Sequence, residues 1–486
     1  MSSLLNIHLR EGSKLKPQPL ISLHPPKNNS GKRKYIFYQK PLIPPTLQKA
    51  GGKMIDELIK ILNRESIEWE IYWEVGRGSS FKIEKCELER AQRKYHSGIG
   101  LRVGYKGKQG FSYITGINHS KEDLERFVKK TMKLAKVGEV KFYGFPDKKP
   151  IKRVNGIYDK RIAELGFEEA LNLGREVSQR ESELREKYGR DYTFSGRLAF
   201  GVAKDGIANS NGIEMEEEGT AMSFSVYVVK KDEKTGTGDY YKASRFMMDF
   251  EKELERGLEK ALQETELSYN AKPLDRFEGE IVFEPHSVAS VLGSFISNLK
   301  GDNVYHKRSR FMAVGENVAS ESFTLVDDAT LEGKIASYSF DGEGNPSQRT
   351  VLVENGILKN FLLDETYARL LGMESTGNAV RDFRTPPHIG TSNILVEGKE
   401  ENLEDFEGVI IKKVFGEHTA NPISGDFSLT VELGYVVKNG ELVPFKDNMF
   451  VGNVFEFMNS IAAVGKEKEE LGAFISPRVL GMGKIV

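Results

Sequence analysis

Cysteine is almost absent from this chain, since Cys86 is the single one among 486 residues. One thiol cannot build a disulfide scaffold, a thiolate zinc site or an iron–sulfur cluster, and it fits a reducing compartment, so we expect a cytoplasmic protein. Long apolar runs are missing as well, and the mean hydropathy is −0.43. No segment approaches the ~18 apolar residues of a membrane-spanning helix, so we expect no membrane partner.

The chain has almost no net charge, but its charges are unevenly distributed. There are 70 Lys and Arg residues against 71 Asp and Glu residues. Residues 1–53 contain ten basic residues and one acid, so the remaining residues have a surplus of ten acids. An acidic body lacks the basic face that nucleic-acid phosphates require, and we therefore do not expect nucleic acid among the partners.

Residues 1–53 differ from the rest in composition. They hold seven of the 17 prolines and show no sustained apolar period. Such a segment cannot build a core, so the sequence predicts a disordered, basic, Pro-rich leader. Helical spacing of apolar residues starts after Met54, at Ile55, Leu58, Ile59 and Leu62. We expect the folded protein to begin near Met54 and the leader to be dispensable.

Strands and helices are expected in groups beyond this point. Alternating patterns predict four short strands in an antiparallel meander, at residues 69–75, 81–88, 98–105 and 109–116. Helices are predicted from Ser120 to Gly138, at 167–188 and at 250–267, with strands between 193 and 230. Because strands and helices do not alternate strictly, the pattern indicates an α+β fold and not a doubly wound one.

The polar, Pro-containing stretch Asn270–Gly279 marks the expected domain boundary. We predict an N-terminal α+β domain at 54–275, with an antiparallel sheet and helices. The second domain, 276–486, is predicted to be Gly-rich and β-rich, either barrel-like or a mixed sheet, with short helices such as one at about 286–299.

Familiar catalytic motifs are missing. No two of the eight histidines lie closer than 16 residues, so no pair can bind a metal from adjacent turns of one helix. There is no Walker A loop and no G-x-S-x-G elbow. Cys86 is expected to be a buried structural thiol in a strand. A metal site assembled from distant residues, such as His388 and His418 beside Asp341 or Glu343, is a minor alternative.

Several polar, Gly-rich strings follow one another between Phe323 and Val464. They are, in order, DD (327–328), DGEGNP (341–346), VENG (353–356), STGNAVR (375–381), NPISGDFS (421–428), VKNGEL (437–442) and VGNVFEF (451–457). In this order they resemble the TldD/PmbA family. The resemblance implies two related subunits that assemble as a heterodimeric zinc metalloprotease acting on unfolded or modified peptides. In that family the TldD type carries zinc through H-E-x-x-x-H on a helix, assisted by a Cys near the C-terminus, and the PmbA type, or TldE, lacks these ligands.

This chain departs from the zinc-bearing type. The region that matches the zinc motif, Leu292–Asn298, contains neither His nor Glu, and the C-terminal segment has no Cys. This chain therefore lacks the imidazoles that would hold the metal and the Glu that would take a proton from bound water, and the hydrolytic step requires both. The resemblance therefore implies a non-catalytic, PmbA-like subunit. No cofactor is expected in this chain, and zinc is expected in a TldD-like paralogous partner.

Two loops and one histidine are candidate contacts for a peptide substrate or for the partner. The candidates are Asp341, Gly342, Glu343, Asn345, Thr376, Asn378, Arg381 and His418. Equally, these residues can serve as turn chemistry that fixes the fold. No catalytic residue and no metal ligand is predicted. Two functional alternatives stay open: a self-sufficient metallopeptidase with a non-standard metal site, or a non-enzymatic regulator that binds a macromolecule, as the family's label of gyrase modulator suggests.

Overall fold

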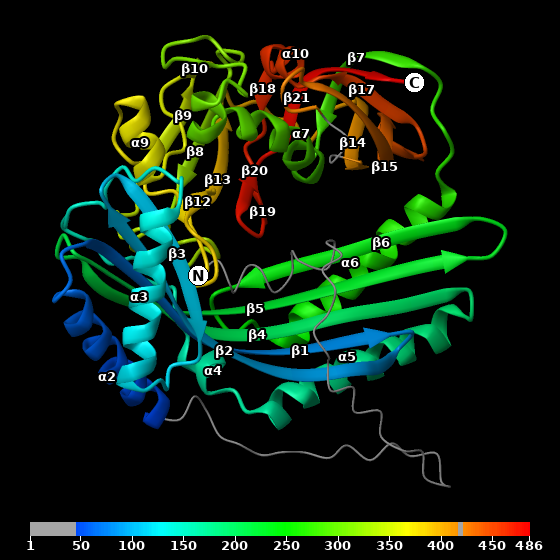
Figure 1. The fold of residues 1–486 in the computed structure, drawn as a ribbon. Coiled ribbons are helices and arrows are strands. Elements are labelled where there is room, and N and C mark those ends of the chain that lie inside the picture. Colours follow the sequence, from blue (N-terminus) through cyan, green and yellow to red (C-terminus); the bar gives the residue numbers. More distant parts are fainter. Residues whose placement is uncertain (1–44, 417–420) are drawn as a thin grey trace, which may run out of the picture.

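The computed structural model describes residues 45–416 and 421–486, which form two parts facing each other (Figure 1). One part is a long antiparallel sheet with helices on one face, and the other combines a smaller sheet with a barrel. The α+β prediction is confirmed. The predicted leader falls largely on residues 1–44, and His418 lies in the second gap; both are outside the described residues. Helix α2 (Pro45–Leu62) starts before Met54, so residues 45–53 are helical.

The first sheet has the strand order β3-β2-β1-β4-β5-β6, with every neighbour antiparallel. Its strands are β1 (Glu68–Glu84), β2 (Glu87–Tyr105), β3 (Lys108–Thr115), β4 (Tyr192–Asn209), β5 (Glu214–Lys231) and β6 (Thr235–Ser244). Three strands replace the four short ones predicted before residue 116, because β1 runs unbroken through Gly76 and Gly78. Cys86 is buried as predicted, but it lies in the β1–β2 turn with φ 64° and not in a strand.

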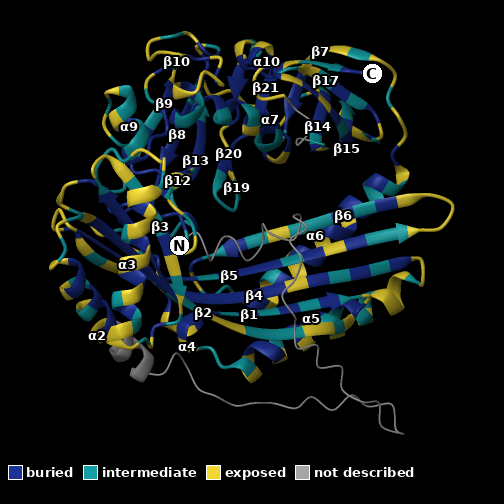
Figure 2. Cartoon of the chain, viewed as in Figure 1, coloured by how far each residue is buried: buried dark blue, intermediate teal, exposed yellow. Residues whose placement is uncertain are grey.

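Helices cover one face of this sheet, and the burial pattern follows from strand alternation (Figure 2). Odd-numbered residues of β1 from Trp69 to Ile83 point at the helices and are largely buried. The helices are α3 (Lys121–Val137) beside α2, then α4 (Lys160–Glu164), α5 (Phe167–Tyr188) and α6 (Phe250–Asn270). Ser120 and Asp123 form the predicted capping box of α3, and α5 has the predicted bounds.

The second part contains a sheet of order β10-β9-β8-β13-β20-β19 and a closed five-stranded barrel. The sheet strands are β8 (Phe323–Asp328), β9 (Arg349–Glu354), β10 (Ile357–Leu358), β13 (Asn393–Gly398), β19 (Glu469–Leu471) and β20 (Phe474–Ser476). The barrel strands are β7 (Phe277–Phe283), β14 (Gly408–Phe415), β15 (Asp426–Lys438), β17 (Met449–Asn453) and β21 (Val479–Ile485). The barrel closes because β14 pairs with both β7 and β15, while β15, β17, β21 and β7 pair in succession.

Short elements complete this part. They are α7 (Pro285–Asn298), α8 (Gly301–Tyr305), α9 (Glu365–Leu371), α10 (Val454–Ser460), β11 (Ala379–Val380), β12 (His388–Ile389), β16 (Glu441–Phe445) and β18 (Ala463–Val464). A type I′ turn joins β9 to β10, since Asn355 and Gly356 have φ of 47° and 77°. None of the described helices is both long and apolar enough to cross a membrane.

Candidate functional site

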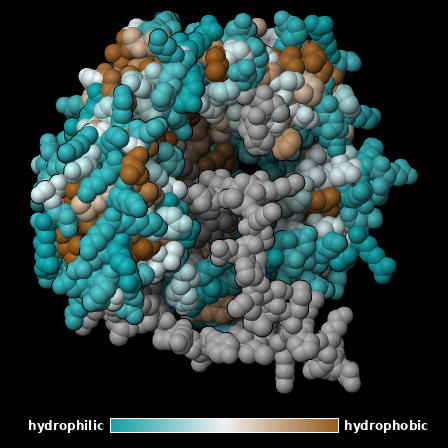
Figure 3. All heavy atoms as spheres, in the orientation of Figure 1, coloured by the Kyte–Doolittle hydropathy of each residue, from teal (hydrophilic) through white to brown (hydrophobic). Residues whose placement is uncertain are grey.

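A cleft opens where the two parts of the molecule meet, and the surface is hollowed there (Figure 3). Its volume is about 970 Å³, and it is lined by residues of β6, α6, α7, β14, β19 and β20. A volume of this size is at the upper end of ligand-binding pockets. Because its walls come from distant parts of the chain and enclose several charged side chains, the cleft is the candidate functional site.

Helix α7 presents a face of small side chains to the cleft. Pro285 opens the helix at its first position, where the missing N–H costs nothing. The opposite face is anchored in the barrel core by Val288, Val291, Leu292 and Phe295. The cleft-lining residues recur at helical spacing: His286, Ala289, Ser290, Gly293, Ser294 and Ser297. This face forms one side of the cleft, the trough, and its polar groups are the imidazole of His286 and the hydroxyls of Ser290, Ser294 and Ser297.

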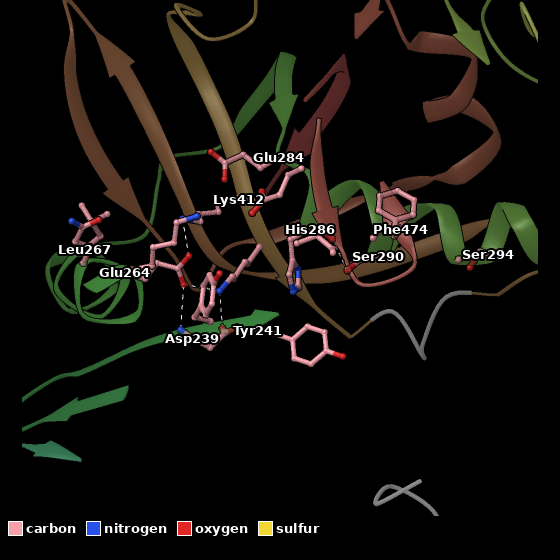
Figure 4. A pocket seen from close by; sticks show the side chains of 18 of the residues that line it. Asp239, Tyr241, Glu264, Leu267, Glu284, His286, Ser290, Ser294, Lys412 and Phe474 are labelled. Carbon is pink, nitrogen blue, oxygen red and sulfur yellow. Dashed lines mark hydrogen bonds and ion pairs between the residues drawn. The ribbon is translucent and has the colours of Figure 1, made fainter. Parts of the chain in front are cut away.

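Ion pairs join the two walls at one end of the cleft (Figure 4). Lys413 Nζ lies 2.6 Å from Glu264 Oε2 and 2.7 Å from Asp239 Oδ1, and Lys412 Nζ lies 2.7 Å from Glu264 Oε1. Burial raises the pKa of the Glu264 carboxyl, but Lys413 and Lys412 outweigh burial and hold that pKa below its ordinary value. These charges compensate one another and tie barrel strand β14 to α6 and β6.

Two further carboxylates line the cleft, Glu284 at the start of α7 and Glu469 on β19 of the smaller sheet. Glu284 pairs with Arg478 at 3.2 Å, and burial, followed by the charge of Glu469 as a smaller cause, raises the pKa of Glu284. Glu469 is exposed on β19 beside Leu471. The cleft therefore contains both satisfied ion pairs and an accessible carboxylate.

The cleft does not fit a zinc ion. A catalytic zinc requires three protein ligands such as His, Cys, Asp or Glu at about 2 Å. Across residues 45–416 and 421–486 no group of three such side chains is arranged to hold a metal ion. On the α7 face only His286 has a ligand-type side chain, and Glu264 is already occupied by two lysines. The alternative site, with His388 and His418 beside Asp341 or Glu343, stays a prediction, because His418 lies outside the described residues.

The described contact candidates lie away from this cleft, and all of them except Gly342 are buried. Asp341, Glu343, Asn345, Asn378 and Arg381 are each at most 3% exposed. They come together in the loops between β8 and β12, where they bond to the chain itself. Whether they also contact a peptide or a partner stays a prediction, as it does for His418, which lies outside the described residues.

Asp341 organises the first of these loops. Its Oδ1 accepts hydrogen bonds from the N–H groups of Glu343 and Asn345, both at 2.9 Å, and its Oδ2 accepts one from Ala379 N at 3.1 Å. The N–H of Gly342 donates to Ala379 O at 2.7 Å. Burial, with the Glu343 charge in addition, raises the pKa of Asp341 well above its ordinary value.

The second loop is held in the same way. Thr376 Oγ1 donates to Asn378 Oδ1 at 2.7 Å, and Asn378 Nδ2 donates to Asp327 Oδ1 at 2.9 Å. Ser392 adds hydrogen bonds to Asp327 from both its N–H and its hydroxyl. These geometries are those of turn chemistry, the alternative interpretation of the two strings.

A buried ion-pair network links these loops to the first sheet. Arg102 donates to both oxygens of Glu70 at 2.8 and 2.9 Å and to Glu343 at 2.7 Å, while Arg381 also pairs with Glu70. Sequence reasoning missed Glu70 and Arg102, because both alternate with apolar residues and so resemble solvent-facing positions. The available signal is their opposite charge at one cross-strand pair of β1 and β2.

Solved structures share this fold. A protein of Thermotoga maritima has a TM-score of 0.79, with 22% identity and coverage of 90% of this chain and 100% of that one. TldE of Thermococcus kodakarensis has a TM-score of 0.77, with 23% identity and coverage of 90% and 100%. The chain thus has the fold seen in TldE.

Sequence comparison establishes the family. The models for PmbA/TldA metallopeptidase domain 1, the central domain and the C-terminal domain match residues 69–135, 160–269 and 278–483. An uncharacterized protein of Methanocaldococcus jannaschii is 32% identical over 435 residues, which cover 89% of this chain and 99% of that protein. Metalloprotease PmbA of Escherichia coli O157:H7 is 24% identical over 446 residues, with 87% and 93% covered. The chain belongs to the PmbA/TldD metallopeptidase family.

Proposed function

We propose that this chain is the PmbA-type, TldE-like subunit of a two-subunit metalloprotease that acts on unfolded or modified peptides. A TldD-like paralogue bearing H-E-x-x-x-H supplies the zinc. The observation that carries the proposal is the α7 face, where Ala289, Ser290, Gly293, Ser294 and Ser297 line the cleft without a metal-binding donor set.

In this proposal the chain takes no part in polarising water or the scissile carbonyl, since residues 45–416 and 421–486 hold no donor set for the zinc that would do so. It contributes surface, and its cleft is a trough that an extended polypeptide fits. Its single thiol is free and buried, in keeping with a cytoplasmic complex. Zinc and the general base come from the partner.

Co-purification with a TldD-like paralogue from the same genome tests the proposal. The two purified chains should form a stable complex on size exclusion, and the mixture should cleave an unstructured protein such as casein much faster than either chain alone. Replacing the Glu of the paralogue's H-E-x-x-x-H by Gln should abolish cleavage and leave the complex intact. Absence of both complex and stimulated cleavage would refute the proposal.

The two alternatives predict different results for the isolated chain. A self-sufficient metallopeptidase would contain stoichiometric zinc by elemental analysis and cleave casein without a partner. A regulator acting on DNA would bind duplex DNA with an affinity that falls steeply as salt rises. The subunit proposal expects neither property.

A further inference from the structure

Glu469 is the one carboxylate lining the cleft that has no ion pair within residues 45–416 and 421–486. The other three, Asp239, Glu264 and Glu284, each have a lysine or arginine nitrogen within 3.2 Å. Glu469 sits on the edge strand β19 and is exposed. The cleft is therefore lined by one exposed carboxylate that has no ion pair among the described residues.

Glu469 lines the cleft from strand β19. Its charge acts on Glu284, on Lys412 and on Tyr240, which belong to three different walls. Glu284, which shares Arg478 with Glu404, lies close enough for the two carboxylates to repel each other. A cation placed between Glu469 and Glu284 would relieve this repulsion.

Aromatic and aliphatic side chains stand beside these carboxylates. Tyr241 of β6 is 41% exposed, and its ring extends into the open part of the cleft (Figure 4). Phe474 and Leu471 line the same region from β20 and β19. Aromatic faces next to carboxylates suit an alkylammonium or guanidinium group, because the rings accept the cation and the apolar wall accepts its carbon stem.

The trough along α7 sets the length of the occupant. Its lining residues run from His286 to Ser297, a helical rise of about 16 Å. An extended chain covers that distance with about five residues. Above Gly293 there is open space, since a Cβ built there meets no atom within 4 Å. The trough is thus long enough for about five extended residues and open above Gly293, as a bound strand of polypeptide requires.

We propose that this cleft binds an extended polypeptide segment and that Glu469 and Glu284, with Tyr241 and Phe474, form a subsite for a lysine or arginine side chain of that segment. The inference rests on the proposed role in peptide handling and adds a preference for basic residues. It assigns the recognition of one substrate side chain to the subunit without zinc.

Fluorescence anisotropy with matched peptides tests the subsite. The full chain is titrated into labelled unstructured peptides that are identical except for a central lysine, norleucine or glutamate. Norleucine keeps the stem of lysine and removes its charge. We expect the lysine peptide to bind about fivefold to tenfold more tightly than the norleucine peptide and the glutamate peptide to bind most weakly. Equal affinity for lysine and norleucine would overturn the subsite.

Glu469→Gln should bring the lysine affinity to that of norleucine and leave the norleucine affinity unchanged. Glu467→Gln is the matched control, because Glu467 is an exposed neighbour that does not line the cleft. It should retain the lysine preference, and an equal loss in this control would show a long-range charge effect and refute the subsite.

Gly293→Trp tests the trough itself. The new side chain enters open space, so the fold should survive, and all three peptides should lose binding while Gly293→Ala retains it. Unchanged binding in a folded Gly293→Trp variant would refute the trough. Complex formation with the paralogue and stimulated casein cleavage are measured in parallel. If these persist without a lysine preference, the subsite is wrong and the subunit role stands; a lysine preference without complex formation would support the subsite and refute the subunit role.

Discussion

Arg102 Nη2 lies 2.7 Å from Glu343 Oε1, and this buried ion pair joins β2 of the first sheet to the Asp341–Pro346 loop of the second part. The same guanidinium holds both oxygens of Glu70 on β1. Burial lowers the pKa of Arg102, but Glu70 and Glu343 outweigh burial and raise it. Arg102 is therefore one of the side chains that hold the two parts together, beside Arg381 and Lys413.

Arg102→Met should destabilise the protein by about 3–5 kcal/mol, because it leaves two buried carboxylates with one arginine fewer. Urea unfolding at neutral pH measures the loss. Arg126→Met is the control: Arg126 forms an exposed ion pair with Asp123 and should change stability by less than about 1 kcal/mol. Similar losses in the two variants would contradict the assigned role of the network.

Glu181 on α5 should make stability fall with rising pH. Its carboxyl oxygens are buried without a hydrogen-bond partner among the described residues, and burial, with the Glu84 charge in addition, raises its pKa from 4.5 to about 8. The folded state thus keeps a proton that the unfolded state releases. The resulting loss in the free energy of unfolding is absent below pH 4.5 and grows between pH 4.5 and about pH 8. It is about 3 kcal/mol at pH 7.

Glu181→Met should accordingly raise the free energy of unfolding by about 2–3 kcal/mol at pH 7 and remove this pH dependence. Urea unfolding between pH 4 and pH 8 provides the measurement. Glu183→Met, at an exposed position that pairs with Arg180, should preserve the slope of the wild type. A wild-type stability that is flat or rising between pH 5 and pH 8, with no gain in the Met variant, would show that Glu181 is ionised in the folded state.

Two glycines should respond in opposite directions to alanine. At Gly238 on β6 a Cβ would lie 2.1 Å from the backbone oxygen of Ala261, so Gly238→Ala should force α6 away and cost about 3 kcal/mol or more. At Gly293 there is open space, and Gly293→Ala should stabilise α7 by about 0.5–1 kcal/mol. Thermal unfolding of both variants compares them directly, and a stable Gly238→Ala would contradict the close packing of α6 on β6.

Local signals account for the parts of the fold that were predicted correctly. Helix α5 follows from its amphipathic spacing and from Glu169, whose carboxylate accepts the N–H of Gly166 at the first turn. The β9–β10 hairpin follows from Asn355-Gly356. The merging of two predicted strands into β1 was missed, because Gly76 and Gly78 indicate a break, whereas pairing with β2 on one side and β4 on the other keeps the strand continuous.

The cleft could not be predicted from local sequence patterns. Its walls combine Asp239, Glu264 and Lys413, whose proximity depends on how the barrel sits against the sheet. The loops with Asp341 and Asn378 suggest surface contacts in the sequence because polar, Gly-rich strings are usually exposed. Here the Asp341 carboxylate accepts backbone N–H groups, and the Asn378 amide bonds to Thr376 and Asp327, which permits their burial.

The ion pairs of Glu264 with Lys412 and Lys413 hold barrel strand β14 against α6 of the first part. Lys413→Met leaves Glu264, 8% exposed, with Lys412 alone and removes the partner of Asp239. We expect a loss of about 2–4 kcal/mol in the free energy of unfolding at pH 7. Amide hydrogen exchange should also quicken in β14 and α6, which the bridge connects.

The stability that the Glu264–Lys413 ion pair contributes is lost at both low and high pH. The pKa of Glu264 is lowered in the folded state, so its contribution is present above its unfolded pKa of about 4.3 and is lost as pH falls through the folded value. The pKa of Lys413 is raised, since Glu264 and Asp239 outweigh burial, so its contribution is present below about 10.4 and is lost as pH rises through the folded value. Lys413→Met should therefore make the stability depend less on pH at both the acidic and the alkaline end.

Adding Glu264→Leu to Lys413→Met removes the carboxylate that has lost its partner and should recover part of the lost stability, because an unpaired buried charge costs more than the absence of the pair. If the double variant is less stable than Lys413→Met by the full cost of Glu264→Leu alone, the two side chains are not coupled and the bridge does not hold the cleft.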